Sequence, residues 1–298
     1  MPEINNGDQP LDLTVLLPSY NEEAAIPTVI REVREALHTW PGRYEILVVD
    51  DASQDGTAAL ARAQGARVVE RVENGGSGAA RKSGLRSARG ALVAMLDADG
   101  SYVAAHLPEL LAYFPGYDQV NGARTSEQGT NRELRRGAKW VIRKLAEWVS
   151  GKRIADLNTG MKVFKRDVML RYLWVIPDGF SCVTSMTLAF LCNGHPVKYV
   201  PVEYRPRIGD SKFHVVKDTA AYLFTVFRIV MYFRPLRVFF PMSLLIGVPA
   251  LAKGWYDWAW SSRHTLQESD IILVIVTFAV LIVGLLAELI VAQRREPL

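Results

Sequence analysis

Two carboxylates one residue apart follow an apolar run near the middle of the chain. Residues 91–95 read Ala-Leu-Val-Ala-Met, and Asp97 and Asp99 come directly after Leu96. If the run is a β-strand, both carboxylates lie at the carboxyl edge of a sheet, where they can bind a divalent cation and the phosphates that it neutralises. Asp and Gly are also ordinary turn residues, so this segment alone fits a solvated turn equally well. A metal-bound diphosphate is the first hypothesis.

The elements expected around this segment alternate between strands and helices. The sequence predicts strands at residues 13–17, 44–49, 66–71 and 91–96 and helices at residues 22–40, 57–64 and 79–88. This alternation predicts an α/β fold with a mainly parallel sheet and right-handed crossovers. In such sheets ligands bind where the strands end.

The segments after the first three expected strands carry side chains suited to binding. They read Pro-Ser-Tyr-Asn-Glu at 18–22, Asp-Asp-Ala-Ser at 50–53 and Asn-Gly-Gly-Ser-Gly at 74–78. The third is not a dinucleotide fingerprint, because Arg81 stands where the last glycine belongs and the segment does not follow the first strand. The sequence therefore favours one shared site at this edge and disfavours a hydride-transfer enzyme.

Composition limits the remaining function classes. The chain has 298 residues, of which 49% are hydrophobic, enough for one large core or for a core plus membrane segments. The net charge of +4 is modest and does not indicate a nucleic-acid partner. Cys182 and Cys192 show no metal-binding spacing and are expected to be reduced thiols in a cytosolic compartment.

Two apolar runs near the carboxyl terminus predict membrane-spanning helices. Residues 238–252 are almost wholly apolar, and residues 271–292 are long enough to cross a bilayer. An aromatic belt of the kind found at membrane surfaces follows the first run. Its members are Trp255, Tyr256, Trp258 and Trp260. A buried hairpin in a soluble core is the alternative interpretation.

Basic residues and the amino terminus predict the orientation of these spans. The flanking basic residues are Arg234, Arg237, Arg294 and Arg295. Their position puts both ends in the cytoplasm, although Lys253 and Arg263 in the expected connecting loop weaken the bias. Residues 1–10 lack the layout of a secretory signal, so the domain between the amino terminus and the spans is also expected in the cytoplasm. Residues 215–233 predict an amphipathic helix, either in the lipid headgroup layer or packed on a core.

Three of these segments together resemble one enzyme family. Residues 15–23, 48–57 and 96–100 are similar to family 2 glycosyltransferases of the GT-A fold. Residues 158–164 and 209–212, with the two spans, resemble dolichol-phosphate mannose synthases and bacterial polyprenyl-phosphate glycosyltransferases. The resemblance implies a cytoplasmic GT-A catalytic domain at 1–212, a juxtamembrane helix at 213–235 and a two-helix transmembrane anchor at 236–298. It also implies a multi-pass protein of the inner or plasma membrane.

The same resemblance implies roles for individual residues. Mg²⁺ or Mn²⁺ is expected on Asp97 and Asp99, beside the diphosphate of a nucleotide-sugar donor. The residues expected to contact the nucleotide are Pro18, Tyr20, Glu22, Asp51, Arg81 and Ala98. The loop expected to meet sugar and acceptor contains Asp156, Asn158, Thr159 and Gly160, together with Arg205 or Arg207. The sequence leaves open which of these two arginines serves the site.

The acceptor implied by the resemblance is a polyprenyl phosphate, undecaprenyl or dolichyl, delivered from the lipid bilayer. Arginine pairs well with phosphate oxygens. The residues assigned to the acceptor phosphate are Arg124, Arg132, Arg136, Ser211 and Lys212, and Arg136 is also a catalytic candidate. A basic helix facing water or headgroups explains the arginines of this stretch equally well.

The implied reaction is an inverting, metal-dependent sugar transfer, with two alternatives. A processive polysaccharide synthase also joins such a domain to membrane helices, but the chain lacks the Gln-x-x-Arg-Trp motif of those enzymes. A non-catalytic nucleotide-sugar binding module is the second alternative, and the paired aspartates argue against it. Gly100-Ser101-Tyr102 replaces the Leu-Gln of many mannose synthases, so the sugar and the choice of GDP or UDP stay open. A homo-oligomer is compatible with the sequence.

Overall fold

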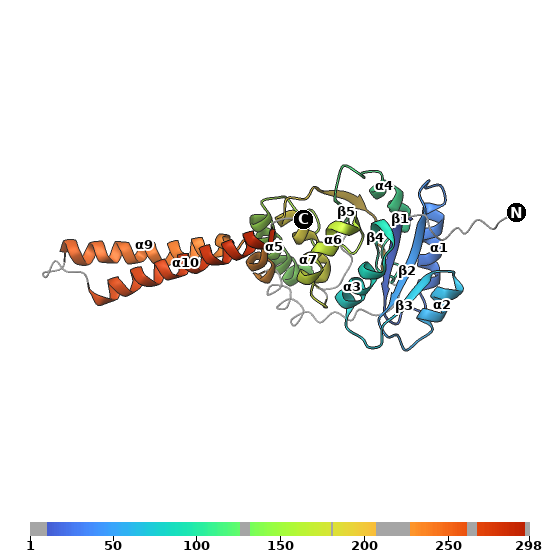
Figure 1. The fold of residues 1–298 in the computed structure, drawn as a ribbon, viewed down its shortest axis with the longest axis horizontal. Helices are drawn as coiled ribbons and strands as arrows, with labels where there is room; N and C mark the ends of the chain where they lie inside the picture. Colours follow the sequence, from blue (N-terminus) through green and yellow to red (C-terminus); the bar gives the residue numbers. More distant parts are fainter. Residues whose placement is uncertain (1–10, 126–131, 180, 207–226, 261–266, 296–298) are drawn as a thin grey trace. The chain divides into compact units, whose positions relative to one another are not determined.

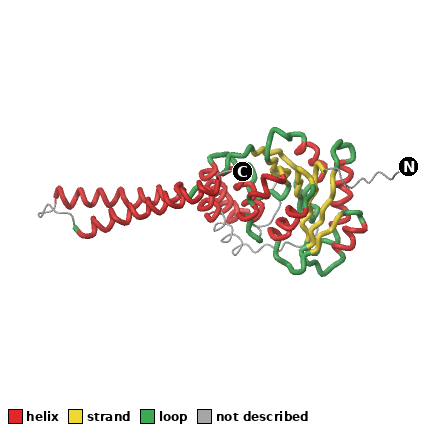
Figure 2. The backbone as a smooth tube through the Cα atoms, viewed as in Figure 1, coloured by secondary structure: helices red, strands yellow, loops and turns green. Residues whose placement is uncertain are grey.

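The computed structural model describes residues 11–125, 132–179, 181–206, 227–260 and 267–295 (Figures 1 and 2). The chain divides into two compact units, residues 1–226 and residues 227–298. The first unit contains the sheet and its helices, and the second contains two long helices. The expected boundaries at residues 212 and 235 remain predictions, since residues 207–226 lie outside the described part.

Seven described strands form one sheet in the order β3-β2-β1-β4-β6-β5-β7. Their bounds are Leu11–Ser19 (β1), Tyr44–Asp50 (β2), Arg67–Glu70 (β3), Gly90–Met95 (β4), Gln119–Arg124 (β5), Lys162–Lys165 (β6) and Val197–Val202 (β7). All neighbours are parallel except that β6 runs antiparallel to both β4 and β5. The prediction of a mainly parallel α/β sheet is confirmed.

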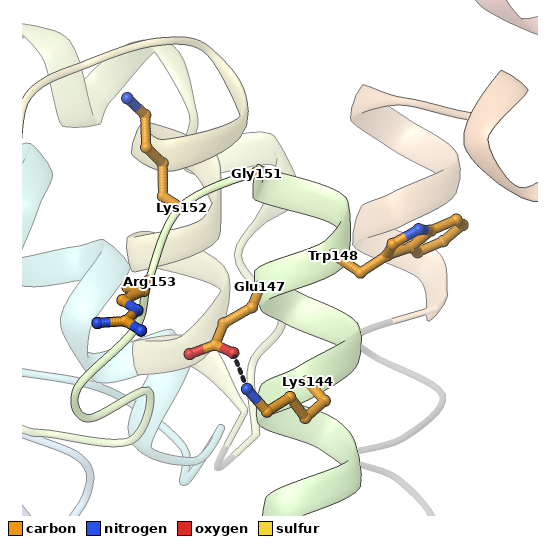
Figure 3. Close-up of a pocket in the computed structure, with 6 residues that line it drawn as sticks. All are labelled: Lys144, Glu147, Trp148, Gly151, Lys152 and Arg153. Carbon is orange, nitrogen blue, oxygen red and sulfur yellow. Dashed lines mark hydrogen bonds and ion pairs between the residues drawn. The ribbon is translucent and has the colours of Figure 1, made fainter.

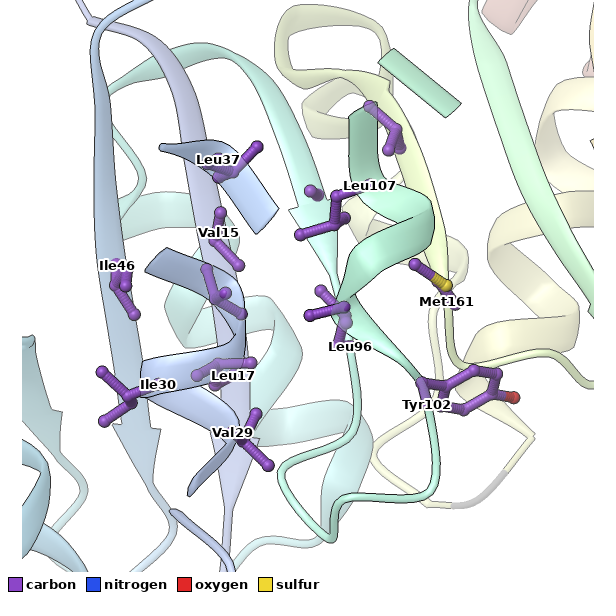
Figure 4. Close-up of a cluster of buried hydrophobic side chains, with 14 of the residues drawn as sticks. Val15, Leu17, Val29, Ile30, Leu37, Ile46, Leu96, Tyr102, Leu107 and Met161 are labelled. Atoms are coloured by element: carbon purple, nitrogen blue, oxygen red, sulfur yellow. The ribbon is translucent and has the colours of Figure 1, made fainter. Parts of the chain in front are cut away.

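Helices cover both faces of this sheet, so successive strand residues are buried on opposite sides. Leu17 packs on one face, in a cluster that includes residues of α1, α2 and α4 (Figure 4). Leu16 packs on the other face, in a cluster that includes residues of α3, α6 and α7. The helix bounds are Ile26–Leu37 (α1), Thr57–Ala63 (α2), Ser77–Ser87 (α3), Leu107–Leu111 (α4), Arg132–Ser150 (α5), Arg166–Arg171 (α6) and Cys182–Cys192 (α7), with short 3₁₀ turns at Ala104–His106 (η1) and Leu173–Val175 (η2).

The antiparallel strand β6 brings distant segments together at one sheet edge. Met95 of β4 lies opposite Lys162 of β6, and Asn121 of β5 lies opposite the same residue. Because β6 runs against its neighbours, its first residue lies where β4 and β5 end. Asp97 after β4, Gly160 before β6 and Arg124 at the end of β5 therefore share this edge.

The first helix begins later than its sequence pattern predicts. The pattern predicts a start at Glu22, but α1 begins at Ile26, with Pro27 in its first turn. The backbone N–H groups of Glu22 and Glu23 instead donate to the side chains of Thr57 and Asp55, at 2.9 and 3.2 Å. These bonds hold residues 20–23 as a loop at the carboxyl end of β1.

The second unit is a hairpin of α9 (Leu236–Trp260) and α10 (Glu268–Arg295). Both helices are long and apolar enough to cross a membrane. A Cβ on Gly247 would lie 2.7 Å from the side chain of Thr277, and one on Gly284 would lie 2.5 Å from Phe239. These glycines let the two backbones approach closely.

The first span differs from its predicted extent. Residues 238–252 were the predicted run, but α9 continues to Trp260 through Pro241 and Pro249. Lys253 therefore lies inside α9 and not in the connecting loop. Its ammonium group pairs with Asp257 at 2.8 Å and with Asp270 of α10, so its charge is neutralised within the hairpin. This location removes one of the two loop cations that weakened the orientation argument.

Two smaller predictions concern the cysteines and the amphipathic segment. Cys182 and Cys192 are both free thiols, and both are buried. Within the predicted helix at residues 215–233, residues 227–233 are helical. Residues 215–226 lie outside the described part, so the amphipathic helix as a whole stays a prediction.

Candidate active site

The Asp97 carboxylate lies at the edge of the sheet beside a buried arginine. Arg81, on α3, donates from Nη2 to Oδ1 of Asp97. The Arg81 side chain is 6% exposed and that of Asp97 33% exposed, so the carboxylate lies at the border between core and solvent. Arg81 thus holds one oxygen of Asp97 in place.

Asp99 is fixed by the residue that follows the turn. Its Oδ1 accepts hydrogen bonds from the backbone N–H and the hydroxyl of Ser101, at 3.0 and 2.6 Å. Gly100 has a φ of +73°, a conformation that glycine adopts without strain. Ala98, between the two carboxylates, is buried. The structure therefore gives Asp97 and Asp99 a defined turn, in place of the mobile solvated one that composition alone allowed.

Gly160 packs directly against Asp97 from the start of β6. A Cβ at position 160 would lie 2.2 Å from Oδ2 of Asp97. Any larger residue would therefore displace the carboxylate. The N–H of Gly160 donates to the hydroxyl oxygen of Tyr102 at 2.7 Å. The Asp156–Gly160 segment is thus in contact with the Asp97–Asp99 turn.

The loops after β1 and β2 are tied together by side-chain hydrogen bonds. Asn21, with a φ of +52°, donates its N–H to the Ser53 hydroxyl at 2.9 Å and accepts from Gln54 N–H at 2.9 Å. Ser53 in turn donates to the carboxylate of Asp50. Tyr20 and Glu22 are half-buried in the first of these loops, and Pro18 pairs with Val49 one residue before the end of β1. The predicted nucleotide residues from β1 and β2 therefore lie on adjacent strands.

Asp51 holds the glycine-rich loop after β3. Its carboxylate pairs with Arg71 and accepts the backbone N–H groups of Gly75 and Gly76, at 3.2 and 2.8 Å. The side chain is 3% exposed. In this structure the Asp51 carboxylate holds residues 71–76 in place. Contact between Asp51 and a nucleotide base would require these bonds to rearrange. Without that rearrangement, a base would contact the loop that Asp51 holds.

The glycines of residues 75–78 serve close packing. The N–H of Gly78 donates to the carbonyl oxygen of Asp178 at 2.7 Å, and Ala79 N–H donates to the same oxygen at 3.3 Å. A Cβ on Gly78 would lie 2.0 Å from the Pro177 carbonyl oxygen. A backbone carbonyl thus occupies the amino end of α3, where a phosphate-binding loop would hold its anion. This geometry agrees with the exclusion of a dinucleotide fingerprint.

Arg124, expected to bind the acceptor phosphate, is paired within the protein. Its Nε and Nη2 donate to Oδ2 and Oδ1 of Asp156 at 2.7 and 2.9 Å, in a bidentate arrangement. Burial opposes ionisation of Asp156, but the hydrogen bonds and charge of Arg124 outweigh it and lower the pKa of Asp156. Burial likewise opposes the charge of Arg124, and Asp156 leaves its pKa raised. The pair is fully ionised and fixes the Asp156 segment to β5.

The remaining residues of that segment anchor it on two sides. Asn158 accepts a hydrogen bond from the Thr184 hydroxyl of α7 at 2.7 Å, and its own N–H donates to Asp156 at 3.0 Å. The Thr159 hydroxyl is buried and donates to the carbonyl oxygens of Gly122 and Met161. All four predicted loop residues therefore lie in one segment, in which Asn158 and Thr159 chiefly stabilise the loop.

Lys162 is a buried cation that sequence reasoning did not single out. Its ammonium group donates to the Thr187 hydroxyl at 2.7 Å and lies 3.4 Å from Oδ1 of Asn121. Burial lowers the pKa of Lys162 to about 7. Since Lys162 lies opposite Met95 at the level of the site, its charge state affects the electrostatics behind Asp97.

The basic stretch that the sequence singled out forms helix α5. One face of α5 is buried, and the other exposes Trp140, Lys144 and Trp148. The buried residues are Ile142, Ala146 and Val149. A shallow pocket at the end of the helix is shown in Figure 3. It is lined by Lys144, Glu147, Trp148, Gly151, Lys152 and Arg153.

Several predicted acceptor residues lie outside the description. The side chains of Arg132 and Arg136 are not described, although both lie in α5. Arg207, Ser211 and Lys212 also lie outside the described residues. Arg205 is described, and its guanidinium pairs with Glu32 of α1 at 3.1 Å. The backbone N–H of Arg205 donates to the Ser101 carbonyl oxygen at 2.8 Å, which joins this strand end to the Asp97–Asp99 turn.

The donor atoms at the turn fit a hard divalent cation. Carboxylate oxygens are the ligands that Mg²⁺ and Mn²⁺ prefer. Within the described residues, no three acidic, histidine or cysteine side chains gather closely enough to hold an ion. Mg²⁺ commonly binds through one or two carboxylates plus substrate phosphates, so Asp97 and Asp99 fit a metal that the diphosphate completes.

Comparison with known proteins matches this architecture. The Glycosyl transferase family 2 profile matches residues 14–173, and the GtrB C-terminal hairpin profile matches residues 234–292. A dolichyl-phosphate hexose transferase of Haloferax volcanii is 32% identical over 212 residues, which cover 70% of this chain and 90% of that protein. A polyprenol monophosphomannose synthase of Mycolicibacterium smegmatis is 32% identical over 66% of this chain and 79% of its own length.

A solved structure shares the fold. The glucosyl-3-phosphoglycerate synthase of Mycobacterium tuberculosis, in complex with Mn²⁺, UDP-glucose and phosphoglyceric acid, superposes with a TM-score of 0.59 at 21% identity. The match covers 74% of this chain and 80% of that one. Both the sheet with its Asp-x-Asp turn and the carboxyl-terminal hairpin now have matches in known families. The chain belongs to glycosyl transferase family 2, and it is a glycosyltransferase.

Proposed function

We propose that this enzyme transfers a sugar from a nucleotide-sugar to a polyprenyl phosphate, with inversion, at the cytoplasmic face of a membrane. The observation that carries the proposal is the contact between Gly160 and Asp97. It joins the Asp97–Asp99 turn, suited to a donor diphosphate, to the segment paired with Arg124. The names of the two relatives support a polyprenyl or dolichyl phosphate acceptor.

The donor side consists of the loops after β1, β2 and β4. We assign the nucleotide to Pro18, Tyr20 and Glu22 and to the loop that Asp51 holds. Asp97 and Asp99 hold Mg²⁺ or Mn²⁺, which when bound supplies positive charge that stabilises the departing nucleoside diphosphate. Arg81 orients Asp97 through the ion pair between them.

The acceptor chemistry asks little of a general base. A phosphate monoester with a second pKa near 6 is largely dianionic at pH 7, so its oxygen can attack the anomeric carbon without losing a proton. The site must instead neutralise and position that anion. Arg124 is occupied by Asp156, so we assign the main phosphate contacts to Arg132, Arg136, Ser211 and Lys212. Arg124, whose charge Asp156 balances, then serves to hold the loop.

The exposed features of both units support delivery from a lipid bilayer. The α9–α10 hairpin is long and apolar enough to anchor the chain. Trp140 and Trp148 are 56% and 48% exposed on α5, on either side of Lys144. Tryptophan and lysine are the residues that suit a headgroup layer with anionic lipids.

A screen of donors and acceptors tests the function. Full-length protein in detergent, with Mn²⁺ or Mg²⁺, is incubated with radiolabelled UDP- or GDP-sugars and undecaprenyl or dolichyl phosphate. Labelled lipid that depends on metal is the expected product. Binding of a nucleotide-sugar with no labelled lipid from any pair identifies the binding-module alternative instead, and a growing polymer identifies a processive synthase.

The acceptor assignment has its own test. Arg136→Ala is expected to raise the KM for polyprenyl phosphate about tenfold and to leave the KM for the donor within about twofold, since a lost phosphate contact weakens acceptor binding alone. Arg171→Ala, at the exposed end of α6, is the control. Equal changes in both KM values would move Arg136 out of the acceptor site.

A further inference from the structure

Tyr102 lies where the metal-binding turn meets the loop before β6. Its side chain is buried, and its hydroxyl oxygen accepts the Gly160 N–H at 2.7 Å. Gly160 in turn packs against Asp97. On its other side Tyr102 follows Ser101, which holds Asp99. One side chain therefore connects the turn that carries both carboxylates to the loop that adjoins them.

The ring of Tyr102 makes a second connection, to the strand end at residues 204 and 205. It packs edge-on against Tyr204 with ring centroids 5.0 Å apart and an angle of 72° between the planes. The two residues also form an antiparallel bridge. The Arg124 guanidinium lies 5.3 Å from the centroid of the Tyr204 ring. The contacts form a closed circuit, since Arg124 binds Asp156 and Asp156 leads back to Gly160.

The hydroxyl is the part of Tyr102 that packing does not explain. Figure 4 shows the ring beside the aliphatic cluster and the oxygen pointing away from it. A phenylalanine would fill the same space in that cluster. Burial raises the pKa of the Tyr102 hydroxyl, so it stays neutral at physiological pH and remains a hydrogen-bonding group. Without it, the buried Gly160 N–H would lose this partner, and an unsatisfied buried donor destabilises the fold.

We propose that Tyr102 is a positioning residue, whose hydroxyl fixes the Asp156–Gly160 loop at a set distance from Asp97 and Asp99. The proposal rests on the proposed function, in which the donor diphosphate lies at the Asp97–Asp99 turn and the acceptor phosphate lies on the side of the Asp156–Gly160 loop. The distance between turn and loop then sets the distance between the two reactants. Reacting atoms must approach to about 3–3.5 Å, and a misplacement of about 1 Å can lower the rate about 100-fold. Tyr102 belongs to the stretch at which this sequence departs from the mannose synthase pattern.

The kinetic test compares Tyr102→Phe with Tyr199→Phe in the full-length enzyme. Tyr199 is a second largely buried tyrosine, on β7, so its variant controls for loss of a hydroxyl in the same sheet. For Tyr102→Phe we expect kcat for transfer to fall about tenfold, with both KM values within about twofold. Hydrolysis of the donor by water should fall much less, so the ratio of hydrolysis to transfer rises. An unchanged ratio, or the same change in Tyr199→Phe, overturns the proposal.

A measurement without substrates separates this proposal from the proposed function. Amide hydrogen exchange is followed by mass spectrometry for wild type and both variants. Faster exchange confined to residues 156–162 in Tyr102→Phe supports the positioning role, whereas unchanged exchange there overturns it. Faster exchange over the whole sheet assigns Tyr102 to the core alone and also overturns it. If wild type labels no polyprenyl phosphate, the proposed function fails, and the exchange result still decides the role of Tyr102.

Discussion

Arg81 and Asp97 form an ion pair that crosses from the buried face of α3 to the end of β4. The guanidinium is nearly inaccessible and the carboxylate is partly exposed, so the pair presents one oriented acidic group to solvent. Nη1 of the same guanidinium donates to the Ser77 carbonyl oxygen at 3.0 Å and lies 3.6 Å from Sγ of Cys182. Arg81 is thereby held by several groups, and its fixed position in turn fixes the Asp97 carboxylate.

Replacing Arg81 should weaken the use of metal. Arg81→Met removes the positive group that orients Asp97, so we expect the Mn²⁺ concentration for half-maximal transfer to rise about tenfold. A Mn²⁺ titration of initial rates measures it. Lys82→Met is the control, because Lys82 is on the same helix as Arg81 and pairs with Asp178 instead. An unchanged Mn²⁺ requirement in Arg81→Met would show that the pair does not tune the site.

Asp99 should be essential for transfer but not for folding. Asp99→Ala removes a carboxylate at the border of the site, and we expect transfer to fall by about 100-fold or more, with the melting temperature within about 3 °C of wild type. Rates of labelled-lipid formation and thermal unfolding in detergent provide the two readouts. Full activity of the variant would exclude a role for Asp99 with the metal.

Gly160 offers a steric test of the central contact. A methyl group at position 160 overlaps Oδ2 of Asp97, so Gly160→Ala should displace the carboxylate and lower transfer about 100-fold. Gly179→Ala is a matched control, because a Cβ at that position meets nothing within 4 Å. Similar activities for the two variants would contradict the close approach of the loop to Asp97.

The pair of Arg124 and Asp156 should be strongly coupled in stability. Both side chains are largely buried, so Arg124→Ala leaves an uncompensated carboxylate and is expected to lower the free energy of unfolding by about 3 kcal/mol. The double variant Arg124→Ala, Asp156→Asn should be more stable than the sum of the two single changes predicts. Denaturant unfolding of the full chain in detergent tests this, and simple additivity would argue against the pair.

Lys162 predicts a rise of stability with pH. Burial lowers its pKa to about 7 in the folded protein, whereas the unfolded chain binds the proton up to about 10.4. Between these values the unfolded state holds more protons, so the folded state gains stability as pH rises through this window. The melting temperature of wild type relative to Lys162→Met should therefore increase from pH 7 to pH 9. A constant difference would mean that Lys162 stays charged in the folded protein throughout this range.

The amino-terminal half of the fold was largely predictable from sequence, because its strands are apolar and its helices amphipathic. The strand expected at 91–96 is β4 at Gly90–Met95, and the helix expected at 79–88 is α3 at Ser77–Ser87. Strands β5 and β6 were not identified. They carry the buried polar residues Gln119, Asn121 and Lys162, so they lack the apolar pattern that marks a strand.

The site followed the same division. The family resemblance pointed to Asp97, Asp99 and the loop of residues 156–160, and the structure brings Gly160 of this loop against Asp97. Sequence could not identify their partners, since an ion pair such as Arg124 with Asp156 depends on which strand ends meet. Tyr102 was noted only as a departure from a pattern. Its contact with Gly160 spans 58 positions of sequence and gives no local signal.

The reversal of direction at β6 has a consequence for how such enzymes diversify. Residues assigned to the nucleotide and the cation follow strands of the half ordered β3-β2-β1-β4, whereas the Asp156–Gly160 loop and its partner Arg124 belong to the half ordered β6-β5-β7. Each half can therefore accumulate changes while the other keeps its ligand. Chimaeras joined after β4 would exchange acceptor preference between relatives and retain the parental donor. The residues at positions 102 and 160 would have to come from the same parent, because they contact each other.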